Sequence, residues 1–248
     1  MGTAGSVVPP EDQAPQSFVS RLVGVFFSPG ETFADIVRKP DIVAPLLVGI
    51  LSAVAFSEVM LAKIGIERII RIQLETSGRS ANMTPEQIDA AVNQGARIGA
   101  ILTHVIGFLA VPVILLIIAA IGLAIVNVIF GARAKFSTAF SVAAYANLVG
   151  ALGGLVGIAV MLFGDPDHFN PAAPVPTGLA FFLDQAHTSK VLFSLATSLD
   201  LFTFWLMALL GIGFSAVTGR KAKPLSVFLA FFGVWAVYVL AKMGLAAM

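Results

Sequence analysis

The chain has no cysteine and very little charge. Only 12% of its 248 residues are Asp, Glu, Lys or Arg, against roughly 25% in a soluble domain. The lack of cysteine excludes disulfides, thiol nucleophiles, Cys-ligated zinc and iron–sulfur clusters. A formal net charge of +1 gives no overall field for nucleic acid, and the basic residues form no single stripe. We therefore expect no nucleic-acid partner.

Sequence motifs of catalysis are also missing. The three histidines, at 104, 168 and 187, are isolated, and neither His-x-x-x-His nor Glu-x-x-His occurs. The chain contains no Gly-x-Ser-x-Gly elbow and no Gly-x-x-x-x-Gly-Lys phosphate loop. The sequence thus predicts no metal, no cofactor and no enzymatic activity.

Long apolar stretches are what the chain does have, with 58% hydrophobic residues and a mean hydropathy of +0.93. Five stretches can each cross about 30 Å of hydrocarbon at ~1.5 Å per residue. A bilayer satisfies no backbone donor or acceptor, so the spans must be helices. We therefore predict an all-α integral membrane bundle of five transmembrane helices, embedded in a lipid bilayer. The expected spans are 42–63, 100–130, 138–163, 191–217 and 225–243.

The first part of the chain differs from the rest. Residues 1–17 contain Gly, Pro, Ser and acidic residues without an apolar run, so we expect a disordered tail ahead of one membrane domain, 18–248. Between 18 and 40, apolar residues recur at helical spacing on both sides of Ser28-Pro29-Gly30. This pattern predicts two amphipathic helices in the membrane interface. They either bind a membrane surface or a protein partner, or pack as a lid on the cytoplasmic end of the bundle, which we favour.

A strong helix start lies between the first two spans. Thr84 supplies an N-cap hydroxyl, Pro85 occupies the first helical position and Gln87 the third, which together make a capping box. A helix from there to Phe130 would be ~69 Å long at 1.5 Å per residue. We therefore expect the first two long helices to project as a hairpin, and Pro112 to bend the second inside the membrane.

The charges of the short loops predict the orientation. Loops 131–137 and 218–224 hold five Lys or Arg residues, whereas loop 164–189 holds three Asp and no basic residue. Short cytoplasmic loops are enriched in Lys and Arg. Four arginines of the hairpin oppose this rule, but four carboxylates accompany them. We expect the N-terminus inside and the C-terminus outside, in the cell membrane if the chain is prokaryotic.

Four ionisable side chains fall in the outer half of the predicted spans: Glu58, His104, Asp200 and Lys242. A charge near the bilayer centre costs roughly 2.5–3.5 kcal/mol on insertion scales. The four either pair between helices and fix the bundle, which we favour, or line a hydrated cavity for a small ion, a proton or a polar headgroup. We expect Asp200 to pair with Lys242 first and with His104 second.

Small residues are concentrated in the third span, at Gly150, Gly153, Gly154 and Gly157. Their spacing favours close approach of two helices. It fits packing within the bundle, which we prefer, or the joining of two copies in a homo-oligomer.

The fourth span carries a short acidic and aromatic motif. The run Ser198-Leu-Asp-Leu-Phe-Thr-Phe-Trp205, followed by Gly211-Ile-Gly213, resembles the fourth-span motif of Yip1-domain proteins. The residues that carry it are Asp200, Phe202, Trp205, Gly211 and Gly213. The entry segment of that family is similar to the order Pro29, Phe33, Ile36, Pro40, Pro45. Many members have a proline in the third span, which is missing here around Tyr145, so this helix is expected to be straighter.

The resemblance covers most of the chain from residue 18 onward and implies a function. Eukaryotic members of this family are membrane-trafficking factors that associate with Rab-type GTPases, whereas prokaryotic members are largely of unknown function. It implies a non-enzymatic membrane-organising or partner-binding adaptor, and the cytoplasmic N-terminal segment would meet the partner. The alternative is a small transporter or lipid-handling protein that uses the outer polar residues.

Overall fold

The computed structural model describes residues 16–165 and 169–247. Most of the tail predicted over 1–17 therefore lies outside the described residues, as do Asp167 and His168. Within them the regular structure is helical, apart from an isolated bridge between Gly178 and Asp200. The all-α class is confirmed.

The helices follow one another with short connections, except for the long segment between α7 and α8. In chain order they are α1 (Phe18–Phe27), α2 (Pro29–Arg38), α3 (Val43–Lys63), α4 (Ile66–Thr76), η2 (Arg79–Asn82), α5 (Pro85–Ala124), the π turn η3 (Ile125–Ile129), α6 (Phe136–Ala146), α7 (Leu148–Phe163), η5 (Leu179–Phe182), α8 (Lys190–Ala196), α9 (Leu201–Val217) and α10 (Pro224–Ala246). Four stretches are long and apolar enough to cross a membrane: α3, α5 with η3, α6 with α7, and α10.

The fourth predicted span, 191–217, is not one helix. α8 ends at Ala196 and α9 begins only at Leu201. Asp200 explains the new start, because its carboxylate accepts hydrogen bonds from the backbone N–H groups of Phe202 (2.8 Å) and Thr203 (3.3 Å) as an N-cap. Five uninterrupted spans are therefore not confirmed, since α8 and α9 divide the fourth.

The third span is also divided, although it contains no proline. α6 and α7 meet at Asn147, whose carbonyl accepts from the N–H of Gly150 at 2.8 Å. That contact joins residues three apart and tightens the backbone as in a 3₁₀ turn. The straighter helix expected here is therefore interrupted instead.

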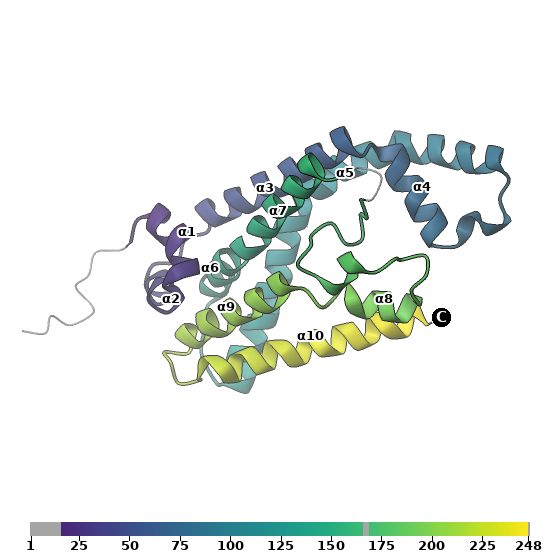
Figure 1. Cartoon of the computed structure of the whole chain (residues 1–248). Coiled ribbons are helices and arrows are strands. Elements are labelled where there is room, and N and C mark those ends of the chain that lie inside the picture. The colour runs from purple at the N-terminus through teal and green to yellow at the C-terminus, as the bar shows by residue number, and fades with distance from the viewer. Residues whose placement is uncertain (1–15, 166–168, 248) are drawn as a thin grey trace, which may run out of the picture.

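The capping box at the start of α5 is confirmed. The N–H of Gln87 bonds the hydroxyl of Thr84 at 3.4 Å, and the N–H of Thr84 bonds the side-chain oxygen of Gln87 at 2.9 Å. With η3 the helix is 45 residues long. Pro112 lies inside it, and Figure 1 shows the helix changing direction along its length, as expected where a proline ring removes a backbone bond.

The projecting hairpin consists of α4 and the first turns of α5 (Figure 1). A Cβ placed on Gly95 or Gly99 would lie 3.1 Å from side-chain atoms of Ile70 or Ile66. The two helices can approach this closely because these positions lack a side chain. At the surface, the guanidinium of Arg71 bonds the carboxylate of Asp89 at 2.7 Å, and this bond raises the pKa of Arg71.

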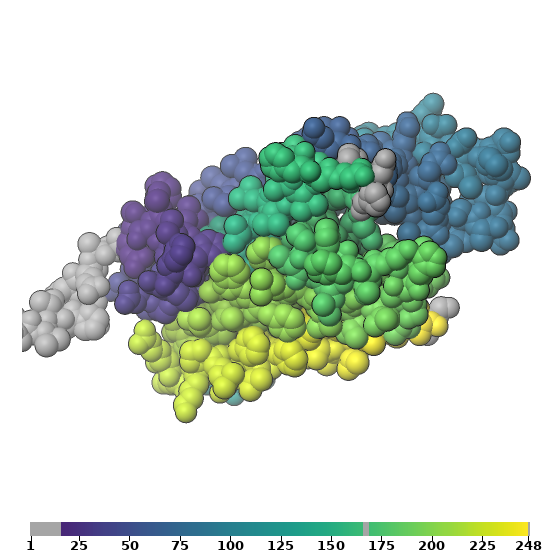
Figure 2. All heavy atoms as spheres, in the orientation of Figure 1, coloured from purple at the N-terminus to yellow at the C-terminus, as the bar shows by residue number. Residues whose placement is uncertain are grey.

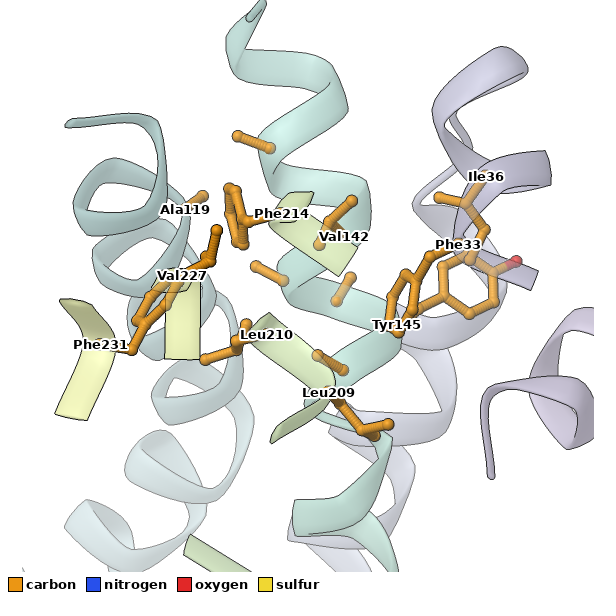
Figure 3. Packing of buried hydrophobic residues seen from close by; sticks show 14 of the residues in the cluster. Phe33, Ile36, Ala119, Val142, Tyr145, Leu209, Leu210, Phe214, Val227 and Phe231 are labelled. Atoms are coloured by element: carbon orange, nitrogen blue, oxygen red, sulfur yellow. The ribbon is translucent and has the colours of Figure 1, made fainter. Parts of the chain in front are cut away.

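The main core lies where α2, α6, α9, α10 and the later part of α5 meet. Figure 3 shows Phe214 among Ala119, Val142 and Val227, with Phe33 beside Tyr145. Many large apolar side chains of α3, α5 and α10 point outward and stay exposed. In a chain with membrane-spanning helices these are the surfaces that contact lipid.

Figure 1 shows how the two ends of the bundle differ. α1, α2 and the connection between α9 and α10 lie at one end, called the inner end below after the orientation that the loop charges predict. The α4–α5 hairpin and the C-terminus lie at the opposite end. The basic loop 218–223 is thus close to the N-terminal helices, which pack on this end of the bundle.

Candidate functional site

The side chains of Glu58 and His104 contact each other between α3 and α5. The imidazole Nε2 lies 3.0 Å from the Glu58 Oε1, and both side chains are 52% exposed. The Nδ1 of His104 lies 2.6 Å from the carbonyl oxygen of Ala100. A carbonyl only accepts, so Nδ1 carries the proton in that contact. The side chains of Glu58 and His104 thus connect α3 to α5 at an exposed position.

Asp200 lies where the long connection after α7 meets the divided fourth span. Its carboxylate caps α9 and also accepts from the hydroxyl of Thr177 at 2.6 Å. Backbone bonds join the same two segments, from Leu201 N–H to the Thr177 carbonyl (3.2 Å) and from Leu179 N–H to the Leu199 carbonyl (3.1 Å). Asp200 thus fixes the long segment between α7 and α8 to the residues that separate α8 from α9.

The expected pairing of Asp200 with Lys242 or His104 is wrong. The ammonium of Lys242 donates to the hydroxyls of Thr197 (2.7 Å) and Ser198 (3.3 Å). The Asp200 carboxylate is already occupied by backbone N–H groups of α9 and by a hydroxyl. The prediction assumed a continuous helix, in which Asp200 would have had no backbone donors to cap. Of the four outer residues, Glu58 and His104 therefore contact each other, whereas Asp200 and Lys242 each have other partners.

The glycines of α7 face other helices of the same chain. A Cβ on Gly153 would lie 3.2 Å from the Phe202 ring, and one on Gly157 would lie 2.6 Å from the Phe56 ring. A Cβ on Gly154 would lie 2.9 Å from the hydroxyl of Ser52, whereas near Gly150 the closest atoms belong to Asn147. Three of the four glycines thus allow α3 or α9 to pack against α7.

The aromatic motif of α9 packs toward the N-terminal helices. The ring of Trp205 stacks on Phe202 at a centroid distance of 6.4 Å and meets the edge of Phe26 at 5.7 Å. A Cβ on Gly213 would lie 2.5 Å from Val142 and 3.0 Å from Phe33. These residues allow α9 to sit tightly between α1, α2 and α6.

Gly211 has the corresponding role toward α10. A Cβ on Gly211 would lie 2.9 Å from the carbonyl oxygen of Pro224 and 3.0 Å from Phe228. The glycine therefore lets the start of α10 approach α9 closely.

A buried polar network that sequence reasoning missed joins the N-terminal helices to the bundle. We call Arg21, Asp35, Asp41 and Tyr145 the Arg21 clamp. The guanidinium of Arg21 bonds Asp35 through Nε and Nη2, both at 2.8 Å, and it also bonds the carboxylate of Asp41. The hydroxyl of Tyr145 donates to Asp41 at 2.8 Å. The clamp thus connects α1, α2, the entry to α3, and α6.

Each charge of the clamp is compensated. Arg21 is 2% exposed, and its guanidinium also donates to the carbonyl of Lys39 at 3.0 Å. Asp35 accepts further bonds from the guanidinium of Arg38 (2.9 Å) and the backbone N–H of Gln16 (3.1 Å). Burial alone would lower the pKa of Arg21, but the hydrogen bonds and negative charges of Asp35 and Asp41 outweigh it and raise that pKa. Buried charges are tolerated when they are paired and bonded in this way.

The sequence did contain a signal for the clamp. Arg21 stands inside an otherwise apolar helix, Phe18–Phe27, and a buried charge in such a helix needs an acidic partner. Asp35 and Asp41 follow closely, on either side of Pro40. Among the described residues, no group of three His, Asp or Glu side chains could hold a metal ion.

The helical architecture and apolar surfaces define a multi-pass membrane protein. The model of the Yip1 domain matches residues 23–245, and the chain therefore belongs to the Yip1-domain family. The members of this family are generally non-enzymatic membrane proteins that act in trafficking. No curated protein and no solved structure matches the chain.

Proposed function

We propose that this Yip1-domain protein is a non-enzymatic adaptor that binds a partner protein at the inner end of its bundle. The observation that carries the proposal is the Arg21 clamp, which fixes α1 and α2 to the spans through buried charged hydrogen bonds. A surface held in one conformation loses less entropy when a partner binds.

The chemistry of the inner end favours an acidic partner. Its exposed cations are Arg38, Lys39, Arg133, Lys135, Arg220, Lys221 and Lys223. Charge complementarity of this kind speeds encounter and selects partners. The same cations support a cytoplasmic location of this end. With α8 and α9 together counted as the fourth of five crossings, the C-terminus would then lie outside.

A photo-crosslinking experiment in native membranes tests the proposal. A photoreactive amino acid replaces Lys221, in the connection between α9 and α10, or, as the matched control, Lys190, the exposed first residue of α8. Figure 1 shows α8 toward the opposite end of the bundle. We expect one discrete protein adduct from position 221 and none from 190. Asp35→Asn, which breaks the clamp, should abolish the adduct, whereas Glu31→Gln, at an exposed carboxylate of the same helix, should preserve it. Identical adducts from both ends, or none from position 221, would refute the proposal.

The second candidate function is that of a small transporter, and the divided fourth span favours it. Discontinuous spans bind substrates or ions in many transporters. Lys242, Thr197 and Ser198 lie at this break, and Asp200 follows it. However, the charges of Asp200 and Lys242 already have protein partners. A thermal shift of the purified protein with small ions or soluble headgroups that disappears in Asp200→Asn would support transport over the adaptor.

A further inference from the structure

α1 buries its charged side chain and exposes apolar ones, the reverse of a helix that faces water. Its single charged residue, Arg21, is 2% exposed, while the apolar residues Val19, Val23 and Phe27 are 54%, 53% and 82% exposed. These three recur at intervals of four residues and therefore share one face of the helix. We call Val19, Val23 and Phe27 the outer face of α1. Phe18, in the first turn, is also 60% exposed.

The opposite side of α1 is apolar as well. Val25 is fully buried, and Leu22 and Phe26 pack against the main core. α1 contains no acidic residue, and its cation is turned into the clamp. Both the packed side and the outer face of α1 thus carry apolar side chains, and an exposed apolar face is favoured in an apolar environment.

We infer that the outer face of α1 binds the lipid of the inner leaflet, at the boundary between headgroups and acyl chains. Interfacial helices of this type bury their apolar face by about 5–10 Å. This role goes beyond partner binding, because it sets the depth at which the inner end sits on the membrane. It does not depend on any partner being present.

Continuity with the spanning helices identifies lipid as the occupant. α1 contacts α3, and the first turns of α3 expose Val43 and Leu47. Figure 2 shows the N-terminal helices forming the molecular surface at this end. The apolar surface of the spans thus extends onto α1, so that one lipid phase can cover both. An outer face without a single charge offers no match to an acidic protein.

Three contacts fix the rotation of α1 and so aim its outer face. The clamp holds Arg21 from one side. Gly24 faces α2 closely, since a Cβ there would lie 2.5 Å from the hydroxyl oxygen of Thr32. Phe26 meets the edge of Trp205. The helix therefore cannot roll to bury Val23 and Phe27 in its own core.

The absence of cysteine in the chain allows a direct test with single spin labels. Val19→Cys, Val23→Cys and Phe27→Cys are each labelled with a nitroxide in the full chain, reconstituted in vesicles of equal parts phosphatidylcholine and phosphatidylglycerol. Collisions with oxygen report hydrocarbon, and collisions with a water-soluble nickel chelate report water. Leu229→Cys, at an exposed apolar position of α10, is the lipid control, and Lys221→Cys is the water control.

We expect oxygen collisions to exceed nickel collisions at positions 19, 23 and 27, as at 229, and the order to reverse at 221. Nickel accessibility at the three positions equal to that at 221 would overturn the inference. Weak collisions with both reagents would overturn it too, because they would show protein, such as a second copy of the chain, covering the face. Since the labelled side chains are exposed, the variants leave the core intact.

Discussion

Removing the carboxylate of Asp35 should release α1 from the bundle. The Asp35 side chain is 3% exposed and accepts from Arg21, Arg38 and the backbone N–H of Gln16. Asp35→Asn preserves the shape but replaces one acceptor by an NH₂ donor that faces guanidinium donors. Breaking a buried pair on one side typically costs about 3–5 kcal/mol. Because Arg21 keeps Asp41 as a counter-charge, we expect the lower end of that range, about 3 kcal/mol.

A double-mutant cycle separates the pair from its surroundings. Arg21→Met alone should cost a similar amount, since it leaves Asp35 and Asp41 short of a donor. Together with Asp35→Asn it should cost clearly less than the sum, because the Asp35 charge that Arg21→Met leaves unpaired is then absent. Couplings of about 0.5–3 kcal/mol are usual for contacting residues. Strict additivity would refute the reasoning that the clamp acts as a unit.

Trp205 provides the readout, since its ring contacts Phe26 of α1. With the second tryptophan removed by Trp235→Phe, fluorescence during unfolding in detergent reports the detachment of α1. Glu31→Gln is the control, because it neutralises an exposed carboxylate of α2. If Asp35→Asn is as stable as this control, the clamp does not hold the helix.

Four further predictions concern the start of α5, the main core and the orientation in the membrane. Thr84→Ala should cost about 1 kcal/mol at the start of α5, seen as faster hydrogen exchange of its first turns. Hydrogen bonds from its own backbone N–H and from Thr84 lower the pKa of Glu86 in the folded chain. The ionised carboxylate therefore stabilises the start of α5 above the pKa it has in the unfolded chain, and this stabilisation is lost as the pH falls through its folded pKa. Acid should thus speed the hydrogen exchange of the same turns. Gly122→Ala would place a Cβ 2.1 Å from the Phe214 ring and should destabilise by about 1–3 kcal/mol in thermal unfolding. Lys221→Cys should react with an impermeant thiol reagent only from the cytoplasmic side of the membrane.

The long spans could be predicted closely from the sequence. The expected stretches 42–63 and 225–243 correspond to α3 (Val43–Lys63) and α10 (Pro224–Ala246). Hydrocarbon thickness imposes a minimum length on every span, so that a continuous apolar run is a sufficient signal. The start of α5 was equally accessible, because the capping box is a local interaction within four residues.

The division of the fourth span was missed because hydropathy is summed over a window. The segment around Ser198 and Asp200 is short, and the apolar residues on both sides outweigh it. Its polar residues are nevertheless typical N-cap residues followed by an apolar run, which is a helix start. Reading Asp200 as a cap would have predicted both the break and the loss of its charge as a partner for Lys242.

Sequence reasoning missed the Arg21 clamp for a different reason: the apolar pattern of α1 does not show whether each face of the helix meets water, lipid or protein. Apolar spacing in α1 shows which residues can be buried, and Leu22, Val25 and Phe26 do pack inward. The apolar spacing does not show that Arg21 also turns inward. The inward position of Arg21 depends on Asp35 and Asp41, which come later in the chain. Asp41 in turn accepts a hydrogen bond from Tyr145, which is 104 residues further along. In water, a helix turns its charge outward. At a membrane boundary the outward face meets lipid, and burying the charge against two acids then costs less than exposing it to hydrocarbon. A lone cation in a short apolar helix beside a membrane span therefore predicts acidic partners on the bundle side.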